Sequence, residues 1–182
     1  MTQGQDQPDY PQTRFSKVVE TLLVTLGLWT GMIWLLLLAV IMVNVIARYW
    51  FAQGFIEFEE LQWHLYSTGF LIGLTYAFVQ DAHVRVDVLH QRWSAVTQAW
   101  IELYGIIIFL MPFLLLVIYA SVPLAQYSFN TAEISQAPGG LPLRWLIKGL
   151  LPVSFILLLV AALARLTRVS SFLFNWPCKV QV

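Results

Sequence analysis

The sequence predicts an all-α integral membrane protein in which four transmembrane helices are joined by short interfacial connectors. Hydrophobic residues make up 59% of the 182-residue chain and charged residues only 11%, a composition too apolar for a soluble domain of this length. Runs of about 20 apolar residues, enough to cross a hydrocarbon core about 30 Å thick, occur four times. The alternating strands of a transmembrane barrel are absent from the sequence, so each run is expected to be a helix.

The four expected spans cover residues 21–46, 61–79, 100–122 and 145–163. Together they form a transmembrane domain over residues 21–166, with an N-terminal tail at 1–20 and a C-terminal tail at 167–182. The polar N-terminal tail differs from a cleaved signal peptide, so we expect the first span to remain in the mature protein. Because the connectors are short, neighbouring helices should run antiparallel.

The distribution of basic residues predicts the orientation of the chain. Seven of the ten Lys and Arg residues lie in the two tails, in the middle loop or, as Arg165 does, just after the fourth span, and three lie near the other two loops. The cytoplasmic side of a membrane protein is enriched in Lys and Arg, so both termini and the middle loop are expected in the cytoplasm. The loops near Phe51 and Asn130 are then expected outside.

The composition also argues against several classes of function. Ten basic and ten acidic residues cancel, so no basic surface for nucleic acid is expected. The single cysteine, Cys178, excludes a disulfide framework and a cysteine-based metal site. Nucleotide-binding loops and nucleophile motifs are absent from the sequence. We therefore expect a subunit of a larger assembly, not an enzyme, and no cofactor.

Polar residues mark the start of the second span. Glu57, Glu60 and His64 lie at i, i+3 and i+7, on one helical face. This spacing suits metal ligands, or interfacial residues at a helix N-terminus, where acids are favoured by the helix dipole. The interfacial interpretation is preferred. Farther along, Gly69 and Gly73 form a GxxxG step, which is either a chance match or a site where another helix approaches closely.

The stretch EISQAPGGLPLRWLIKGLLP, residues 133–152, leads into the last span. Its prolines and glycines cannot continue a helix and predict a turn at Pro138, Gly139, Gly140 and Pro142. Arg144 and Lys148 then lie one helical turn apart with Trp145 between them. These three residues are expected either to anchor the helix among lipid headgroups or to dock on a partner.

The middle loop contains the stretch HVRVDVL, in which polar and apolar residues alternate. This pattern favours an extended segment along the membrane interface. Asp87 and Ser94 can cap a short helix and the third span, so His83, Arg85, Asp87 and Ser94 are expected to form a structural connector. The alternative is a metal site with His83, Asp87 and His90 as ligands.

Two stretches, HVRVDVL and EISQAPGGLPLRWLIKGLLP, in a four-span chain of this length resemble the small membrane subunit of tripartite ATP-independent periplasmic (TRAP) transporters, the DctQ-like family. The resemblance runs from about Phe15 to Leu166, with the spans in the same order. One departure is that the segment LLLVAALARL in the last span lacks the polar Gln expected there.

The resemblance implies a multi-pass protein of the bacterial inner membrane with two protein partners. A large TRAP membrane subunit would carry the substrate and sodium sites, and a periplasmic solute-binding receptor would deliver an organic acid. The small subunit would brace the large one in the lipid bilayer as a fixed scaffold. A static part needs no charge within the membrane, which agrees with the nearly charge-free expected spans.

Two other classes remain open from the residues alone. The first is a haem-binding membrane anchor of a redox enzyme, although only His64 lies in an expected span and a bis-histidine site needs two facing helices. The second is a small four-helix exporter that acts alone. Such an exporter is expected to keep an acid within a span, and the nearest acid is Glu102, at the border of the third span.

Overall fold

The computed structural model describes residues 10–52, 54–82, 93–137 and 140–176, and these residues form helices and connectors without strands. The helices are α1 (Arg14–Trp50), α2 (Ile56–Val79), α4 (Ala95–Tyr104), η1 (Gly105–Leu110), α5 (Met111–Asn130) and α6 (Arg144–Phe174). One continuous helix, Ala95–Asn130, contains α4, η1 and α5, and η1 is its π-helical segment. An all-helical architecture is therefore confirmed for the described residues.

Three helices among the described residues are long and apolar enough to cross a membrane: α1, the continuous helix Ala95–Asn130, and α6. The helix expected as the second span, α2, is present but is not apolar enough to meet the same criterion. Polar side chains lower its apolar character, namely Glu57, Glu59, Glu60, Gln62, His64, Ser67 and Thr68. The expectation of four transmembrane helices is thus not confirmed.

The helices extend beyond the expected spans. α1 begins at Arg14 because a capping box precedes it: the Thr13 hydroxyl accepts a hydrogen bond from the Ser16 N–H, and the Ser16 hydroxyl accepts one from the Thr13 N–H. α6 continues past residue 163 to Phe174, where Asn175 adopts the left-handed φ of 57° that commonly ends a helix. Both expected tails are therefore partly helical.

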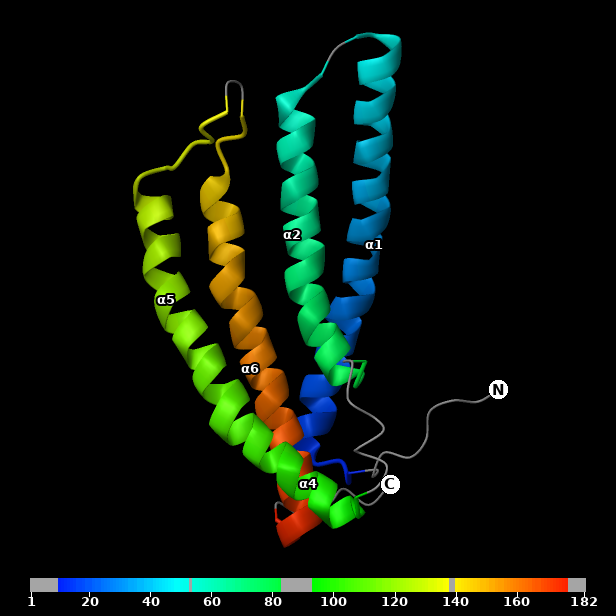
Figure 1. Ribbon diagram of the computed structural model, residues 1–182, viewed down its shortest axis with the longest axis vertical. Helices are drawn as coiled ribbons and strands as arrows, with labels where there is room; N and C mark the ends of the chain where they lie inside the picture. Colours follow the sequence, from blue (N-terminus) through cyan, green and yellow to red (C-terminus); the bar gives the residue numbers. More distant parts are fainter. Residues whose placement is uncertain (1–9, 53, 83–92, 138–139, 177–182) are drawn as a thin grey trace, which may run out of the picture.

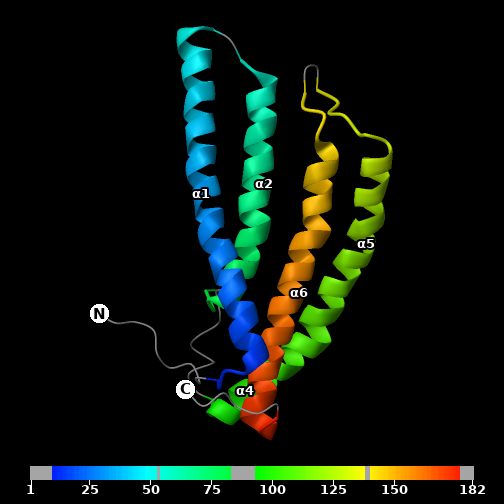
Figure 2. The same ribbon diagram turned by 180° about the vertical axis from the view of Figure 1, so that it is seen from behind.

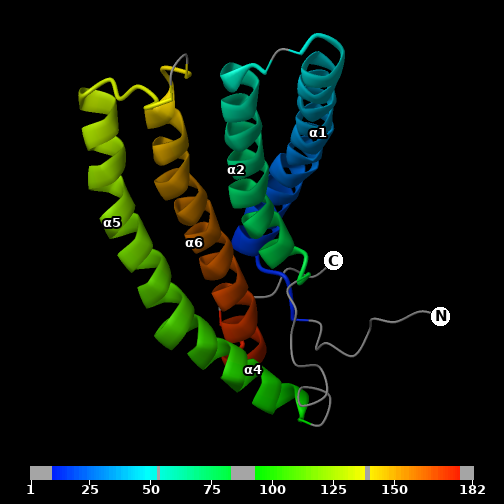
Figure 3. The same ribbon diagram turned by 45° about the horizontal axis from the view of Figure 1, so that its top comes forward.

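The helices lie side by side in the order α5, α6, α2, α1 (Figure 1). The view from behind and the tilted view show the same order, with α1 and α5 at the two flanks (Figure 2, Figure 3). The hairpins α1–α2 and α5–α6 come together near α4 and separate toward the loops that join their helices. We call these two ends the α4 end and the loop end. α6 contacts every other described helix.

The buried apolar core lies toward the α4 end. Its three clusters each unite the second half of α6 with α1 or with the helix that contains α4. α6 contributes Ala161, Ala162 and Ala164, which are almost fully buried. Small residues let helix backbones approach closely. The segment LLLVAALARL, which lacks the expected Gln, therefore packs through these alanines.

The α1–α2 hairpin depends on two glycines. A Cβ atom added at Gly27 would lie 2.0 Å from the Tyr76 ring, and one at Gly69 would lie 3.1 Å from the Trp34 ring. A Cβ added at Gly73 would have no heavy atom of a neighbour within 4 Å. Within the described residues, only one of the two glycines of the GxxxG step, Gly69, therefore lies in close contact with α1.

Candidate functional site

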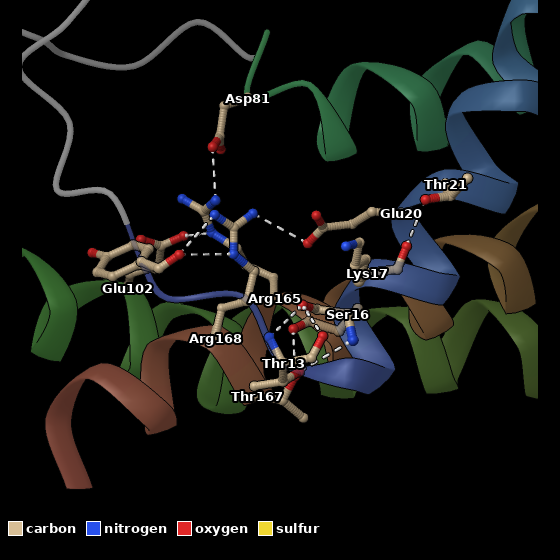
Figure 4. A network of polar contacts seen from close by, with 12 residues as sticks. Thr13, Ser16, Lys17, Glu20, Thr21, Asp81, Glu102, Arg165, Thr167 and Arg168 are labelled. Carbon is tan, nitrogen blue, oxygen red and sulfur yellow. Dashed lines mark hydrogen bonds and ion pairs between the residues drawn. The ribbon is translucent and has the colours of Figure 1, made fainter. Parts of the chain in front are cut away.

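At the α4 end, Arg165 of α6 lies between two acidic residues from other parts of the chain (Figure 4). Its Nε donates to Oε1 of Glu102 in α4 at 2.6 Å, and its Nη1 donates to Oδ2 of Asp81, just after α2, at 2.7 Å. The guanidinium also lies over the Tyr10 ring, 5.0 Å from its centroid. Arg165 is only 9% exposed. One side chain thus connects α6 with α4, with the end of α2 and with the segment before α1.

Arg168 lies almost one turn farther along α6 and makes a second set of contacts. Its Nη1 lies 3.1 Å from Oε1 of Glu20 in α1, and its Nη2 donates to the Tyr10 carbonyl at 2.9 Å. Beside this pair, the hydroxyl of Thr13 lies 3.1 Å from that of Thr167 (Figure 4). These contacts hold the first turns of α1 against the last turns of α6.

We call the five charged residues Glu20, Asp81, Glu102, Arg165 and Arg168 the arginine cluster. They come from α1, the end of α2, α4 and α6, so the cluster joins the two hairpins at one end of the molecule. Charges removed from water are stable only when they are paired and hydrogen-bonded. Because Arg165 pairs with Glu102 and Asp81, and Arg168 pairs with Glu20, loss of either arginine would remove a cation that these partly buried carboxylates contact.

The sequence alone did not indicate this cluster. Arg165 and Arg168 contribute there only to the basic side of the membrane, and Glu102 is merely the acid nearest to a span. The structure carries these charges inside long helices, so the picture of nearly charge-free spans does not hold over the full length of α1, α4 and α6. One signal was available: an arginine interrupts the apolar run LLLVAALARL, and charges within a membrane generally pair with one another.

At the loop end, Glu60 of α2 binds the connector between α5 and α6. Its carboxylate accepts a hydrogen bond from the Ser135 hydroxyl, and its Oε2 accepts one from the backbone N–H of Leu141 at 2.5 Å. A Cβ atom added at Gly140 would lie 2.7 Å from Oε1 of Glu60 and 2.5 Å from the Ser135 Cβ. A larger residue at position 140 would therefore push the connector away from α2.

Glu133 binds the two cations that flank Trp145 at the start of α6. Lys148 Nζ lies 2.5 Å from Oε2 of Glu133, and Arg144 Nη1 lies 3.8 Å from Oε1. Trp145 packs edge-to-face on Phe129 at the end of α5, with 5.4 Å between ring centroids. Arg144 and Lys148 thus have a partner within the chain.

We call Glu60, Glu133, Ser135, Leu141 and Lys148 the loop cluster. The hydrogen bond from Ser135, followed by that from Leu141, holds the pKa of Glu60 below its ordinary value of 4.5. The hydrogen bond from Lys148 lowers the pKa of Glu133 in the same way. Both carboxyl groups are therefore charged at neutral pH. The loop cluster connects α2 to the connector and the connector to α6.

The other residues singled out in the sequence have different positions. Ser94 is the N-cap of α4, and its hydroxyl accepts a hydrogen bond from the Thr97 N–H at 3.3 Å, as expected for a cap. Pro142 is exposed just before α6. The remaining residues of the middle loop and of the predicted turn lie outside the described residues: His83, Arg85, Asp87, His90, Pro138 and Gly139.

The acids and the histidine at the start of α2 do not converge on one point. Glu57 is exposed, Glu60 binds the connector, and Nδ1 of His64 lies 2.7 Å from the backbone carbonyl of Glu60. Among the residues that the structure describes, no group of three His, Cys, Asp or Glu side chains is placed to hold a metal. The two clusters instead connect one helical hairpin to the other.

A comparison with known protein families found a match. A family model described as "Tripartite ATP-independent periplasmic transporters, DctQ component" matches residues 37–171. The matched region contains the whole loop cluster and all of the arginine cluster except Glu20. No curated protein and no solved structure matches the chain significantly. Since the family match covers more than half of the chain, the protein belongs to the DctQ family, the small membrane components of TRAP transporters.

Proposed function

We propose that the protein is the scaffold subunit of a TRAP secondary transporter. In this proposal it braces the large membrane subunit during sodium-coupled uptake of an organic acid that a periplasmic receptor delivers. The family match over residues 37–171 carries the proposal. The fixed contacts of the arginine cluster support the bracing role, because they hold the two hairpins in one arrangement.

The partners of the buried charges favour a static part over a transport path. Ion and proton pathways place ionisable groups along a water-filled cavity. Here Arg165 is almost fully buried and its guanidinium is held by Glu102 and Asp81 from two other parts of the chain. An arginine in such a position is suited to joining helices. The substrate and sodium sites are therefore proposed to lie in the large subunit.

The proposed placement is the bacterial inner membrane, with α2 as the second of four crossings and both termini in the cytoplasm. α2 has 24 residues, equivalent to about 36 Å at 1.5 Å per residue, which exceeds the hydrocarbon thickness. It also packs against both α1 and α6. Neighbouring helices can shelter its polar residues from lipid.

Cysteine labelling tests this orientation. After Cys178 is replaced by Ser, the variant Asn130→Cys should react with an impermeant thiol reagent in intact cells. The variant Gln12→Cys should react only after the cells are opened, because the basic side of the membrane is cytoplasmic. The opposite pattern would show that the orientation is inverted.

Reconstituted transport tests the function itself. Proteoliposomes with the small and large subunits, plus the receptor, should take up a radiolabelled organic acid when a sodium gradient is imposed. Uptake should fail when any one of the three proteins is omitted. Full uptake without the small subunit, or uptake by the small subunit alone, would contradict the proposal.

A further inference from the structure

The start of α1 carries two exposed cations, Arg14 and Lys17. Over residues 10–52, 54–82, 93–137 and 140–176, neither side chain takes part in a hydrogen bond or an ion pair. Each of the other described Lys and Arg side chains contacts a carboxylate: Arg48, Arg144, Lys148, Arg165 and Arg168. The two cations at the start of α1 therefore differ from the rest of the described chain.

The position of these cations does not favour the helix itself. The N-terminus of a helix is the positive end of its dipole, so cations near it are electrostatically unfavourable. The first turn of α1 contains no acidic residue. The next acid along α1, Glu20, contacts Arg168 at 3.1 Å (Figure 4). Within the described residues, positive charge at this end is thus left for an external anion to neutralise.

The same two residues lie at one border of the charge-free part of α1. Residues 21–47 contain no Asp, Glu, Lys or Arg. At 1.5 Å per residue this run extends about 40 Å, close to the thickness of a bilayer with its headgroups. Lys17 precedes the run by about 6 Å along the helix and Arg14 by about 10 Å. Because both side chains are long and flexible, their charged groups can reach the phosphates of the headgroups.

Exposed apolar side chains follow the two cations on the same side of α1. With about 3.6 residues per turn, Val18 lies one turn after Arg14, and Leu28 lies three turns after Lys17. Val18 is 61% exposed and Leu28 is 64% exposed. This side of α1 therefore changes from charged to apolar toward the interior of the membrane, as a phospholipid does from its phosphate to its acyl chains.

We propose that the start of α1 binds an anionic phospholipid, with Arg14 and Lys17 on its phosphate and with its acyl chains along Val18 and Leu28. Charge complementarity selects this occupant, because Lys and Arg next to a membrane span attract anionic lipids. A soluble anion would neutralise the cations but would leave the apolar side chains beside them uncovered. The inference goes beyond the proposed function and does not depend on the large subunit, the substrate or the orientation in the membrane.

Titration of the full-length protein with phosphatidylglycerol in a non-ionic detergent tests the site. Native mass spectrometry measures the affinity, which should fall about fivefold in Arg14→Gln, about fivefold in Lys17→Gln and further in the double variant. Both side chains are exposed, so the melting temperature in lipid-free detergent should stay at the wild-type value. Arg48→Gln is the matched control, because Arg48 is an exposed cation at the other end of α1 that contacts Glu59. It should bind the lipid as the wild type does.

The other outcomes would overturn the inference. Unchanged affinity in the double variant would show that these cations do not hold the lipid. An equal loss in Arg48→Gln would show a general attraction of the lipid to exposed cations. Complete competition by glycerol 3-phosphate, which has the phosphate but no acyl chains, would show a site for a soluble anion. Zwitterionic phosphatidylcholine should bind more weakly to the wild type, and equal affinity for both lipids would contradict the role of charge.

Discussion

The two ends of the molecule are held together in different ways. At the α4 end, buried apolar clusters surround two arginines that each contact an acid on another part of the chain. At the loop end the hairpins separate, and hydrogen bonds from a single connector reach Glu60. The hairpins therefore share buried contacts at the α4 end, whereas at the loop end one connector joins them through hydrogen bonds.

This asymmetry fits the proposed scaffold role, in which the subunit keeps a fixed arrangement and leaves wide apolar faces to its surroundings. A closed four-helix bundle would bury most of its apolar side chains in its own core. Here only 17–22% of the residues in the apolar windows of the spanning helices are buried. Most of that surface is therefore available to lipid or to a partner, and the polar contacts at the ends maintain the arrangement.

The largest effect is expected from Arg165→Ala. It removes the guanidinium that Glu102 and Asp81 both contact, and breaking a buried ion pair typically costs about 3–5 kcal/mol. Because the Asp81 side chain is 28% exposed, we expect a loss toward the lower end of this range. Thermal unfolding of the purified protein in detergent measures this loss. The double variant Arg165→Ala with Glu102→Ala should lose less than the sum of the single variants. An unchanged melting temperature in Arg165→Ala would show that the α4 end does not depend on this arginine.

The next effect is expected from Gly27→Ala. The added Cβ would lie 2.0 Å from the Tyr76 ring, and overpacking of this kind typically costs about 1–3 kcal/mol. Gly73→Ala is the matched control, because no neighbouring heavy atom lies within 4 Å of its added Cβ. That control should be neutral or slightly stabilising, since Ala has the higher helix propensity. Equal melting temperatures for both variants would show that α1 and α2 are loosely packed.

A smaller effect on stability is expected at the loop end from Glu60→Ala. The variant loses the hydrogen bonds to Ser135 and Leu141, so the connector should detach from α2 while the α4 end stays intact. Limited proteolysis should cut the connector between α5 and α6 faster than in the wild type, with little change in melting temperature. The exposed neighbour Glu57 provides the control variant Glu57→Ala, which should be cut at the wild-type rate.

The smallest effect is expected from pH at Glu133. The pKa of its carboxyl group is lowered from 4.5, so the ionised form is bound more tightly in the folded protein than in the unfolded chain. The stabilisation is complete above about pH 4.5 and is lost as the pH falls through the lowered pKa. Cleavage of the connector by an acid-active protease should thus increase only below about pH 4.5. In Glu133→Gln the increase at low pH should be reduced.

The positions of the helices could largely be predicted from the sequence, but their ends and their partners could not. The four expected spans each fall within a helix, because a long apolar run must satisfy its own backbone hydrogen bonds. The helices extend beyond the expected spans where polar caps begin them, as Thr13 and Ser16 do for α1. α2 was expected as a span equal to the others, yet its polar residues leave it less apolar than they are.

The candidate site shows the same limit. The sequence singled out Glu60, Arg144 and Lys148 as residues for lipid or partner contact. The linear sequence does not show which residues of the same chain lie next to them in the fold. The structure gives Glu60 a contact with a segment about 75 residues away and places both cations beside Glu133. Such pairs depend on how the hairpins are arranged, which hydrophobic periodicity does not encode.

The sequence by itself therefore determined an all-helical membrane protein, the approximate helices and the resemblance to the DctQ family, since run length, composition and short motifs are local properties of a chain. Only the tertiary structure decided that Arg165 and Arg168 join the hairpins, that Gly69 rather than Gly73 contacts α1, and that Arg14 and Lys17 lie exposed. Each of these depends on which helices become neighbours and how far each is rotated about its axis, and both are set by packing across the whole molecule.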